Sequence, residues 1–277
     1  MYNSLWQATQ KNSLISRLDF RSKLVMVIVI TLIAFTWESP ITSGILTILV
    51  ALACLFSGIK LNYLATILKF MLPFYLFLLL TMGFFNVEQV KVLTNKSELT
   101  ALLSIKGFNL TLEGILYGLS VIFKTLTMIL VIPLGIFTTD LNQMIVGLTK
   151  IKVPYKIVFI FSSTLRLFPL LAQELEGIID AQKLRGLSIE KMGLLRKARV
   201  YAAIAIPLIL NAMVKSQKME IVLQTKAFSG DNNRTYLSES KLSEIDYAFI
   251  IFFIVLLIVV LVLYVVFGVG KFWWLLK

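Results

Sequence analysis

The chain has 277 residues, of which 58% are hydrophobic and 15% are charged, and its formal net charge is +12. Soluble domains carry roughly 25% charged residues, so the composition predicts an integral membrane protein. Histidine is absent and Cys54 is the only cysteine, which argues against imidazole catalysis, Cys-His nucleophiles and His- or Cys-rich metal sites. We therefore expect no catalytic residue, no metal site and no bound cofactor in this chain.

The excess of basic residues predicts the orientation. With the amino terminus inside the cell, the inner segments 1–23, 60–69 and 138–246 carry 21 Lys and Arg residues, whereas the outer segments 38–40, 86–113 and 268–277 carry 5. Cytoplasmic loops are enriched in basic residues, which also contact anionic lipid headgroups. The prediction is a multi-pass protein of the cell membrane with a cytoplasmic amino terminus. Nucleic acid is not an expected partner, because the bases are not gathered in a soluble domain.

Five apolar stretches predict transmembrane helices, namely residues 24–37, 39–59, 70–87, 114–139 and 247–270. About 20 helical residues cross a bilayer, so the first stretch is short; it either extends into the Ser39-Pro40 turn or forms a tight hairpin with the second. Lys124 lies inside the fourth stretch. For this lysine we favour a structural role over a transport site, although a lysine within a span is a functional candidate by default.

The segment from Thr138 to Asp246 differs from the rest of the chain. It carries 15 Lys or Arg and 10 Asp or Glu residues around apolar stretches, which is typical of long amphipathic helices with charged ends in water. The predicted fold is an all-α integral membrane protein, with about five transmembrane helices and long amphipathic helices on the cytoplasmic side. The predicted domains are a four-span region (1–137), the cytoplasmic or interfacial helices (138–246) and a final transmembrane helix (247–277).

The segment Leu18–Leu24 precedes the first span and contains Asp19, Arg21 and Lys23. Two interpretations are open. The basic residues can anchor the helix at the lipid headgroups, or the alternating charges can form an internal network at the cytoplasmic face.

Helix boundaries can be placed within the central segment. Asp140 ends a Thr-Thr-Asp sequence that can cap a helix from Leu141, and Pro154 can open the next helix. That helix is expected to end at Arg185-Gly186, since a base in the last turn followed by glycine is a C-terminal signal. Arg185 either offsets the helix dipole or, as an exposed guanidinium on a rigid tip, docks a soluble partner.

A similar helix end, with a basic residue and a nearby glycine, follows 41 positions later at Lys226-Ala227 and Gly230. Two basic helix tips in the largest cytoplasmic region predict a two-point contact with a partner.

These motifs resemble those of the transmembrane T components of energy-coupling factor (ECF) transporters. Residues 18–24 match the family's opening Leu-Asp-Pro-Arg-x-Lys-Leu, with Phe20 in place of proline. The family's central elements correspond in order to Thr138–Asp140, Val153-Pro154, Arg166, Pro169 and Ala181–Gly186. The family's second Ala-Arg-Gly element corresponds to Thr225-Lys226-Ala227, where lysine keeps the charge but lacks arginine's planar fork of donors.

The resemblance implies a prokaryotic importer of vitamins or transition-metal ions in which this chain is the coupling subunit and not an enzyme. Two ABC-type ATPases bind and hydrolyse ATP, and a small substrate-binding membrane protein, the S component, carries the cargo. The Arg185-Gly186 and Lys226-Ala227 tips then dock the ATPases, and their inequality slightly favours two different ATPases. Asp19, Arg21, Lys23, Asp140, Pro154, Arg166, Pro169 and Ala181 are the expected structural or coupling residues.

Three other classes of function would need different sequence features. A secondary transporter needs ionisable groups at the bilayer midplane and related halves, and only Lys124 qualifies. A substrate-translocating ABC permease also uses a coupling helix, but with a different motif. A membrane enzyme needs clustered catalytic groups, whereas Glu174, Glu176 and Asp180 are typical of a solvated helix face.

Overall fold

The computed structural model describes residues 18–59, 61–85, 90–91, 101–105, 108–136, 138–186, 193–228 and 242–271. Its main elements are α2 (Phe20–Thr36), α3 (Pro40–Phe56), α4 (Leu61–Phe85), β1 (Ala101–Ile105), β2 (Phe108–Thr111), α6 (Leu112–Ile136), α7 (Leu141–Lys150), α8 (Tyr155–Leu184), α9 (Leu194–Thr225) and α10 (Glu244–Val266). The predicted helical membrane fold is confirmed. The antiparallel pair β1–β2, which was not predicted, is a small addition to it.

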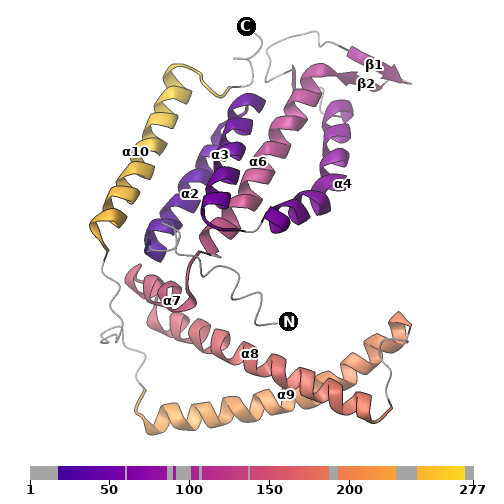
Figure 1. Ribbon diagram of the computed structural model, residues 1–277, viewed down its shortest axis with the longest axis vertical. Helices are drawn as coiled ribbons and strands as arrows, with labels where there is room; N and C mark the ends of the chain where they lie inside the picture. Colours follow the sequence, from indigo (N-terminus) through magenta and orange to yellow (C-terminus); the bar gives the residue numbers. More distant parts are fainter. Residues whose placement is uncertain are drawn as a thin grey trace. The chain divides into compact units, whose positions relative to one another are not determined.

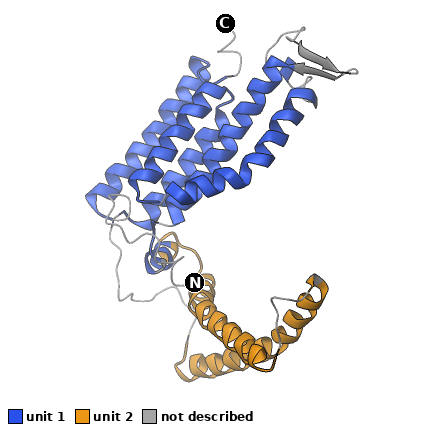
Figure 2. Ribbon diagram, turned by 45° about the vertical axis from the view of Figure 1, so that its right-hand side comes forward, with its two compact units in different colours: residues 1, 3–147, 240–277 blue, residues 2, 148–239 orange. Residues whose placement is uncertain are grey.

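The chain divides into two compact units, coloured separately in Figure 2. The first comprises residues 3–147 and 240–277, and the second residues 148–239, so the division falls within α7. The predicted domain limits after residues 137 and 246 stay predictions.

In the first unit, α6 packs against α2, α3 and α4, and α10 packs against α2. Figure 1 shows these helices side by side. One apolar cluster joins Met26 and Ile30 of α2 to Val50 of α3 and Leu130 of α6. A second cluster joins α2 and α3 to Val260 of α10. Apolar side chains at helical spacing therefore form the core, while large apolar residues stay exposed on the outer faces, as expected where lipid is the solvent.

Glycines allow α4 and α6 to approach closely. Gly114 and Gly118 are spaced by four, so they share one face of α6. A Cβ on Gly114 would lie 3.2 Å from Cα of Gly83, and one on Gly118 would lie 3.3 Å from Cβ of Met82. This is the small-residue packing by which membrane helices associate, because van der Waals contact replaces the hydrophobic effect there.

Five helices in the described part of the chain are long and apolar enough to cross a membrane: α4, α6, α8, α9 and α10. Two of these, α8 and α9, come from the segment predicted to form amphipathic cytoplasmic helices, and that placement stays a prediction. Helices α2 and α3, which correspond to the first two predicted spans, have only 17 residues each. The expected start of the third span, at Phe70, was wrong, since α4 begins at Leu61. Lys69 lies inside that helix because a single long charged side chain can extend toward water without ending it.

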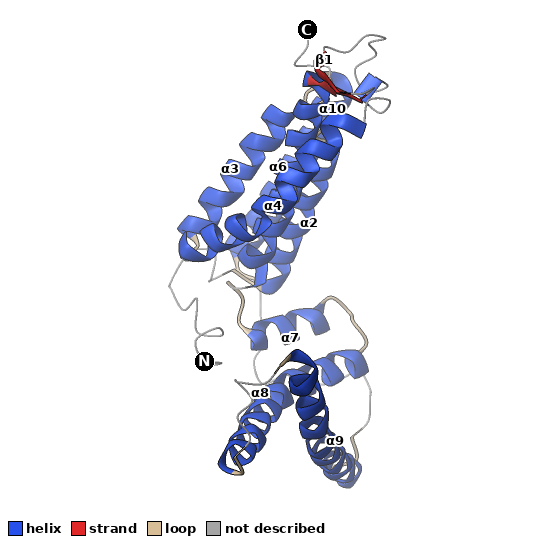
Figure 3. Cartoon of the chain, turned by 90° about the vertical axis from the view of Figure 1, so that its right-hand side faces the viewer, coloured by secondary structure: helices blue, strands red, loops and turns tan. Residues whose placement is uncertain are grey.

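In the second unit, the long helices α8 and α9 cross (Figures 1 and 3). Lys215 of α9 forms an ion pair with Glu174 of α8, with side chains 30% and 28% exposed. The pair links the two helices, and its partial burial shields it from the solvent that weakens fully exposed pairs.

Candidate functional site

The amino-terminal motif forms part of a buried polar cluster that joins the first and last helices. Asp19 is the N-cap of α2, and its carboxylate accepts a hydrogen bond from the backbone N–H of Arg21 and pairs with the Arg21 guanidinium at 3.2 Å. Asp246 of α10 accepts from the backbone N–H of Asp19 at 2.9 Å and from the Ser22 hydroxyl at 3.0 Å. The structure thus contains the internal network that was one of the two interpretations of this motif.

Lys23 extends the cluster to the end of α6. Its Nζ donates to the backbone carbonyl of Thr138 at 2.5 Å, and the residue is 1% exposed. A buried ammonium needs acceptors and compensating charge, and Asp19 and Asp246 provide the opposite charge. We call Asp19, Ser22, Lys23, Thr138, Ser243 and Asp246 the polar clasp.

Asp246 is not among the residues predicted from sequence to be functional. Its other oxygen accepts from the backbone N–H of Ser243 at 2.9 Å, and the Ser243 hydroxyl accepts from the Asp246 N–H, which completes a capping box. A serine followed three residues later by an acidic residue before an apolar run is the sequence signal for this arrangement. That signal predicts the cap but not the contact with Asp19.

Phe20, which replaces the family's proline, packs on α7. Phe20 is 9% exposed, and a Cβ on Gly147 would lie 2.5 Å from Cδ1 of its ring. Only a residue without a Cβ therefore fits at Gly147 with the ring in this position. The phenylalanine that replaces the family's proline at residue 20 therefore packs against Gly147 of α7.

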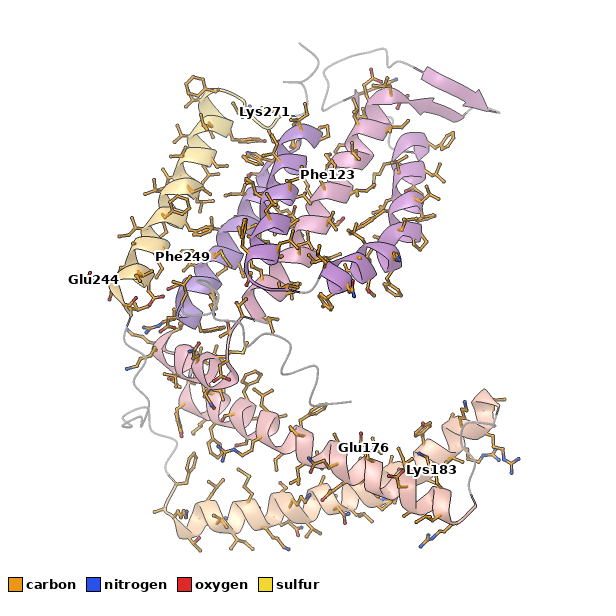
Figure 4. All side chains as sticks on the ribbon, viewed as in Figure 1. Phe123, Glu176, Lys183, Glu244, Phe249 and Lys271 are labelled. Atoms are coloured by element: carbon orange, nitrogen blue, oxygen red, sulfur yellow. The ribbon has the colours of Figure 1, made fainter. Side chains whose placement is uncertain are left out.

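The predicted tip of α8 has the expected shape. Helix α8 ends at Leu184, with Arg185 at the C-cap. The backbone N–H of Arg185 donates to the carbonyl of Ala181 at 3.3 Å, and the N–H of Gly186 donates to the carbonyl of Lys183 at 2.9 Å. Gly186 has a left-handed φ of +88°, which glycine adopts without steric cost. Leu184 is 91% exposed, and Figure 4 marks Lys183 at this end of the helix.

The tip of α9 has the same backbone geometry. Lys226 is the C-cap, with φ −88° and ψ 11°, beside φ −78° and ψ 10° for Arg185. Ala227 takes the left-handed position with φ +49°. The backbone N–H of Ala227 donates to the carbonyl of Gln224 at 3.0 Å, and the N–H of Phe228 donates to the carbonyl of Leu223 at 2.9 Å. These two hydrogen bonds form a complete Schellman motif. Lysine and alanine at this tip therefore preserve the shape found at Arg185-Gly186.

The remaining predicted residues lie as follows. Asp140 directly precedes α7, and its carbonyl accepts from the Met144 N–H at 3.0 Å. Pro154 is the N-cap of α8, next to the first helical residue Tyr155. Arg166 and Pro169 lie on exposed positions within α8. The roles of these four residues stay predictions.

Lys124 lies beside the end of α2. Its Nζ donates to the backbone carbonyl of Phe35 at 3.4 Å. A cation at the carboxyl end of a helix offsets the negative end of the dipole, which fits the structural role favoured for this residue.

The fold and these sites define a multi-pass helical membrane protein in which the two longest of the described helices, α8 and α9, end in exposed cations. The sequence profile of the family described as cobalt transport protein, CbiQ, matches residues 11–237. The chain therefore belongs to this family.

Curated relatives agree with this assignment. The energy-coupling factor transporter transmembrane protein EcfT of Streptococcus thermophilus is 28% identical over 233 residues, covering 81% of this chain and 84% of the relative. EcfT of Acidaminococcus fermentans is 26% identical over 251 residues, covering 88% and 90%. EcfT of Streptococcus equi is 29% identical over 231 residues, covering 81% and 82%. The chain is the transmembrane component of an ECF transporter.

Proposed function

We propose that this chain is the coupling subunit of an importer, transmitting ATP-driven motion of two ABC-type ATPases to a substrate-binding membrane protein. The cargo class is a vitamin or a transition-metal ion. ATP is bound and hydrolysed by the partners, and this chain holds no cofactor. Its amino terminus is cytoplasmic, as the distribution of basic residues favours.

The observation that carries this proposal is the shared geometry of the two helix tips. Arg185 and Lys226 occupy equivalent C-cap positions, each followed by a residue in the left-handed conformation. Both cations are exposed and stand on rigid helices, so each can reach carbonyl or carboxylate groups of a soluble partner. Two such tips suit a pair of ATPase subunits.

The crossing of α8 and α9 suggests how motion is transmitted. Two helices that touch at a crossing can shear when their ends are displaced, and such motions of packed helices are an established means of conformational change. Closure of the ATPases on ATP would displace the tips. The apolar stretches of α8 and α9 would then carry the movement to the substrate-binding protein.

The experiment is a pull-down of the tagged chain from its native membranes in detergent, with wild type beside Arg185→Glu. We expect wild type to retain ABC-type ATPases and a small membrane protein, and the variant to lose the ATPases. Arg199→Glu, at an exposed arginine of α9 for which no role is predicted, controls for a general effect of charge reversal. Equal recovery of ATPases with Arg185→Glu would refute docking at this tip. Solute transport by the purified chain alone, without ATP, would favour a secondary transporter instead.

A further inference from the structure

An aromatic cluster connects the end of α9 to the beginning of α8. The ring of Phe228, two residues after Lys226, lies 4.5 Å from the Phe159 ring and 6.0 Å from the Tyr155 ring, centroid to centroid. The rings of Tyr155 and Phe159 are 6.3 Å apart. These tilted arrangements fall within the range of about 4.5–7 Å in which aromatic pairs attract.

The cluster fixes the otherwise strained tip at Lys226. Ala227 has a φ of +49°. Residues with a Cβ avoid this conformation because the Cβ approaches the following carbonyl. Such a conformation persists where neighbouring contacts hold it. Here the hydrogen bond from the Phe228 N–H to the Leu223 carbonyl and the packing of the Phe228 ring hold the residue after Ala227. The hydrogen bond from the Lys226 N–H to the Val222 carbonyl holds the residue before it.

The two tips are therefore placed at opposite ends of one helix. Arg185 caps the carboxyl end of α8, whereas Phe228 attaches the Lys226 tip to Tyr155 and Phe159 in the first turns of α8. Helix α8 has 30 residues, so its axis is about 45 Å long at about 1.5 Å per residue. This helix, which has Pro169 in its interior, separates the two cations.

We propose that Phe228, Tyr155 and Phe159 are positioning residues that hold the Lys226 tip at the amino end of α8 and so set the spacing between the two docking tips. Displacement of the Lys226 tip is delivered to the first turns of α8 through these rings, and not only through the helix crossing. This inference rests on the proposed docking function for its consequence in transport. The spacing itself is a property of the chain alone.

The spacing is tested by spin labels on cysteines at Lys183 and Gln224, which are exposed residues beside the two tips, in a Cys54→Ser background. Pulsed dipolar spectroscopy on the full chain in lipid nanodiscs measures the label-to-label distance. We expect one narrow distribution of several nanometres for wild type and for Phe228→Tyr. Phe228→Ala should broaden it at least twofold. An unchanged width for Phe228→Ala would overturn the positioning role.

A second variant separates loss of the contact from misfolding. Phe159→Ala removes the opposite ring and should broaden the distribution as Phe228→Ala does. The double variant should show no further broadening, because both substitutions remove the same contact. Additive broadening would mean that each ring acts through other neighbours, which contradicts the proposal.

The consequence for transport is tested in the assembled complex as cargo taken up per ATP hydrolysed. Phe228→Ala should lower this ratio roughly five- to tenfold while ATPases still co-purify through Arg185, and Phe228→Tyr should restore it. A normal ratio with Phe228→Ala overturns the transmission role while leaving the proposed function intact. Failure of wild type to bind any ATPase would refute the proposed function, whereas the spectroscopic result would still decide the positioning role.

Discussion

The carboxylate of Asp246 accepts a hydrogen bond of 2.9 Å from the backbone N–H of Asp19, which lies 227 positions earlier in the chain. Asp19 is the N-cap of α2, and Asp246 lies in the first turn of α10. The negative charge of each residue therefore lies at the positive end of a helix dipole, where it is stabilising. One carboxylate thus orders the starts of two helices that sequence alone does not connect.

Asp246→Ala should destabilise the first unit by about 2–4 kcal/mol, because it leaves the buried Asp19 N–H and Ser22 hydroxyl, and the part-buried Ser243 N–H, without their acceptor. Thermal unfolding of the purified protein in detergent measures the change. Glu244→Gln, at an exposed position two residues earlier, is the control and should change the free energy of unfolding by less than about 0.5 kcal/mol. A similar small effect for Asp246→Ala would show that the clasp contributes little.

Gly147→Ala should destabilise the contact between α2 and α7 by about 1–3 kcal/mol, because the added methyl group overlaps the Phe20 ring. Phe20→Ala in the same chain should recover part of this loss by making room for the methyl group. Denaturant unfolding of the single and double variants gives the coupling energy. If the two variants lowered the free energy of unfolding by strictly additive amounts, the contact between Phe20 and Gly147 would be contradicted.

Gly118→Leu should separate α6 from α4, since a Cβ at this position already lies within 3.3 Å of Cβ of Met82. We expect a loss of at least about 2 kcal/mol in stability, measured by thermal aggregation in detergent. Gly177→Ala is the matched control, because a Cβ there meets nothing within 4 Å. Alanine is the better helix former, so this control should be neutral or slightly stabilising.

The two tips should respond oppositely to exchanging glycine and alanine. Gly186→Ala places a Cβ in the left-handed region and should cost about 1–2 kcal/mol of local stability, whereas Ala227→Gly relieves the same strain and should be neutral or favourable. Hydrogen exchange of the amides at each helix end reports these local changes. Faster exchange near Lys226 with Ala227→Gly would argue against strain at that tip.

Much of the helical architecture could be predicted from local sequence. Apolar stretches located the helices of the first unit, except that α4 begins at Leu61 and not at Phe70. The starts of α7 and α8 follow Asp140 and Pro154 as expected. Arg185-Gly186 marked the end of α8 because a glycine after a basic residue suits the left-handed C-terminal position. These signals operate over one or two helical turns, where the sequence itself determines the geometry.

The long-range contacts could not be predicted in the same way. Nothing near Asp19 indicates that its partner is Asp246, and nothing near Phe228 indicates that its ring lies against Tyr155 and Phe159. The left-handed conformation of Ala227 was also hidden, since alanine gives no local signal for it. Such features arise from packing between distant segments, which periodicity and capping rules do not describe.

Helix α10 has two buried residues, Asp246 and Val260, among its 23, and Asp246 attaches its amino end to the start of α2. During synthesis, Asp246 leaves the ribosome 227 residues after Asp19. The donors at the start of α2 must therefore interact with water or lipid headgroups until almost the whole chain has been made. Closure of the clasp is consequently a late step of membrane assembly, and quality-control proteases would meet the open form of any chain that stalls before α10.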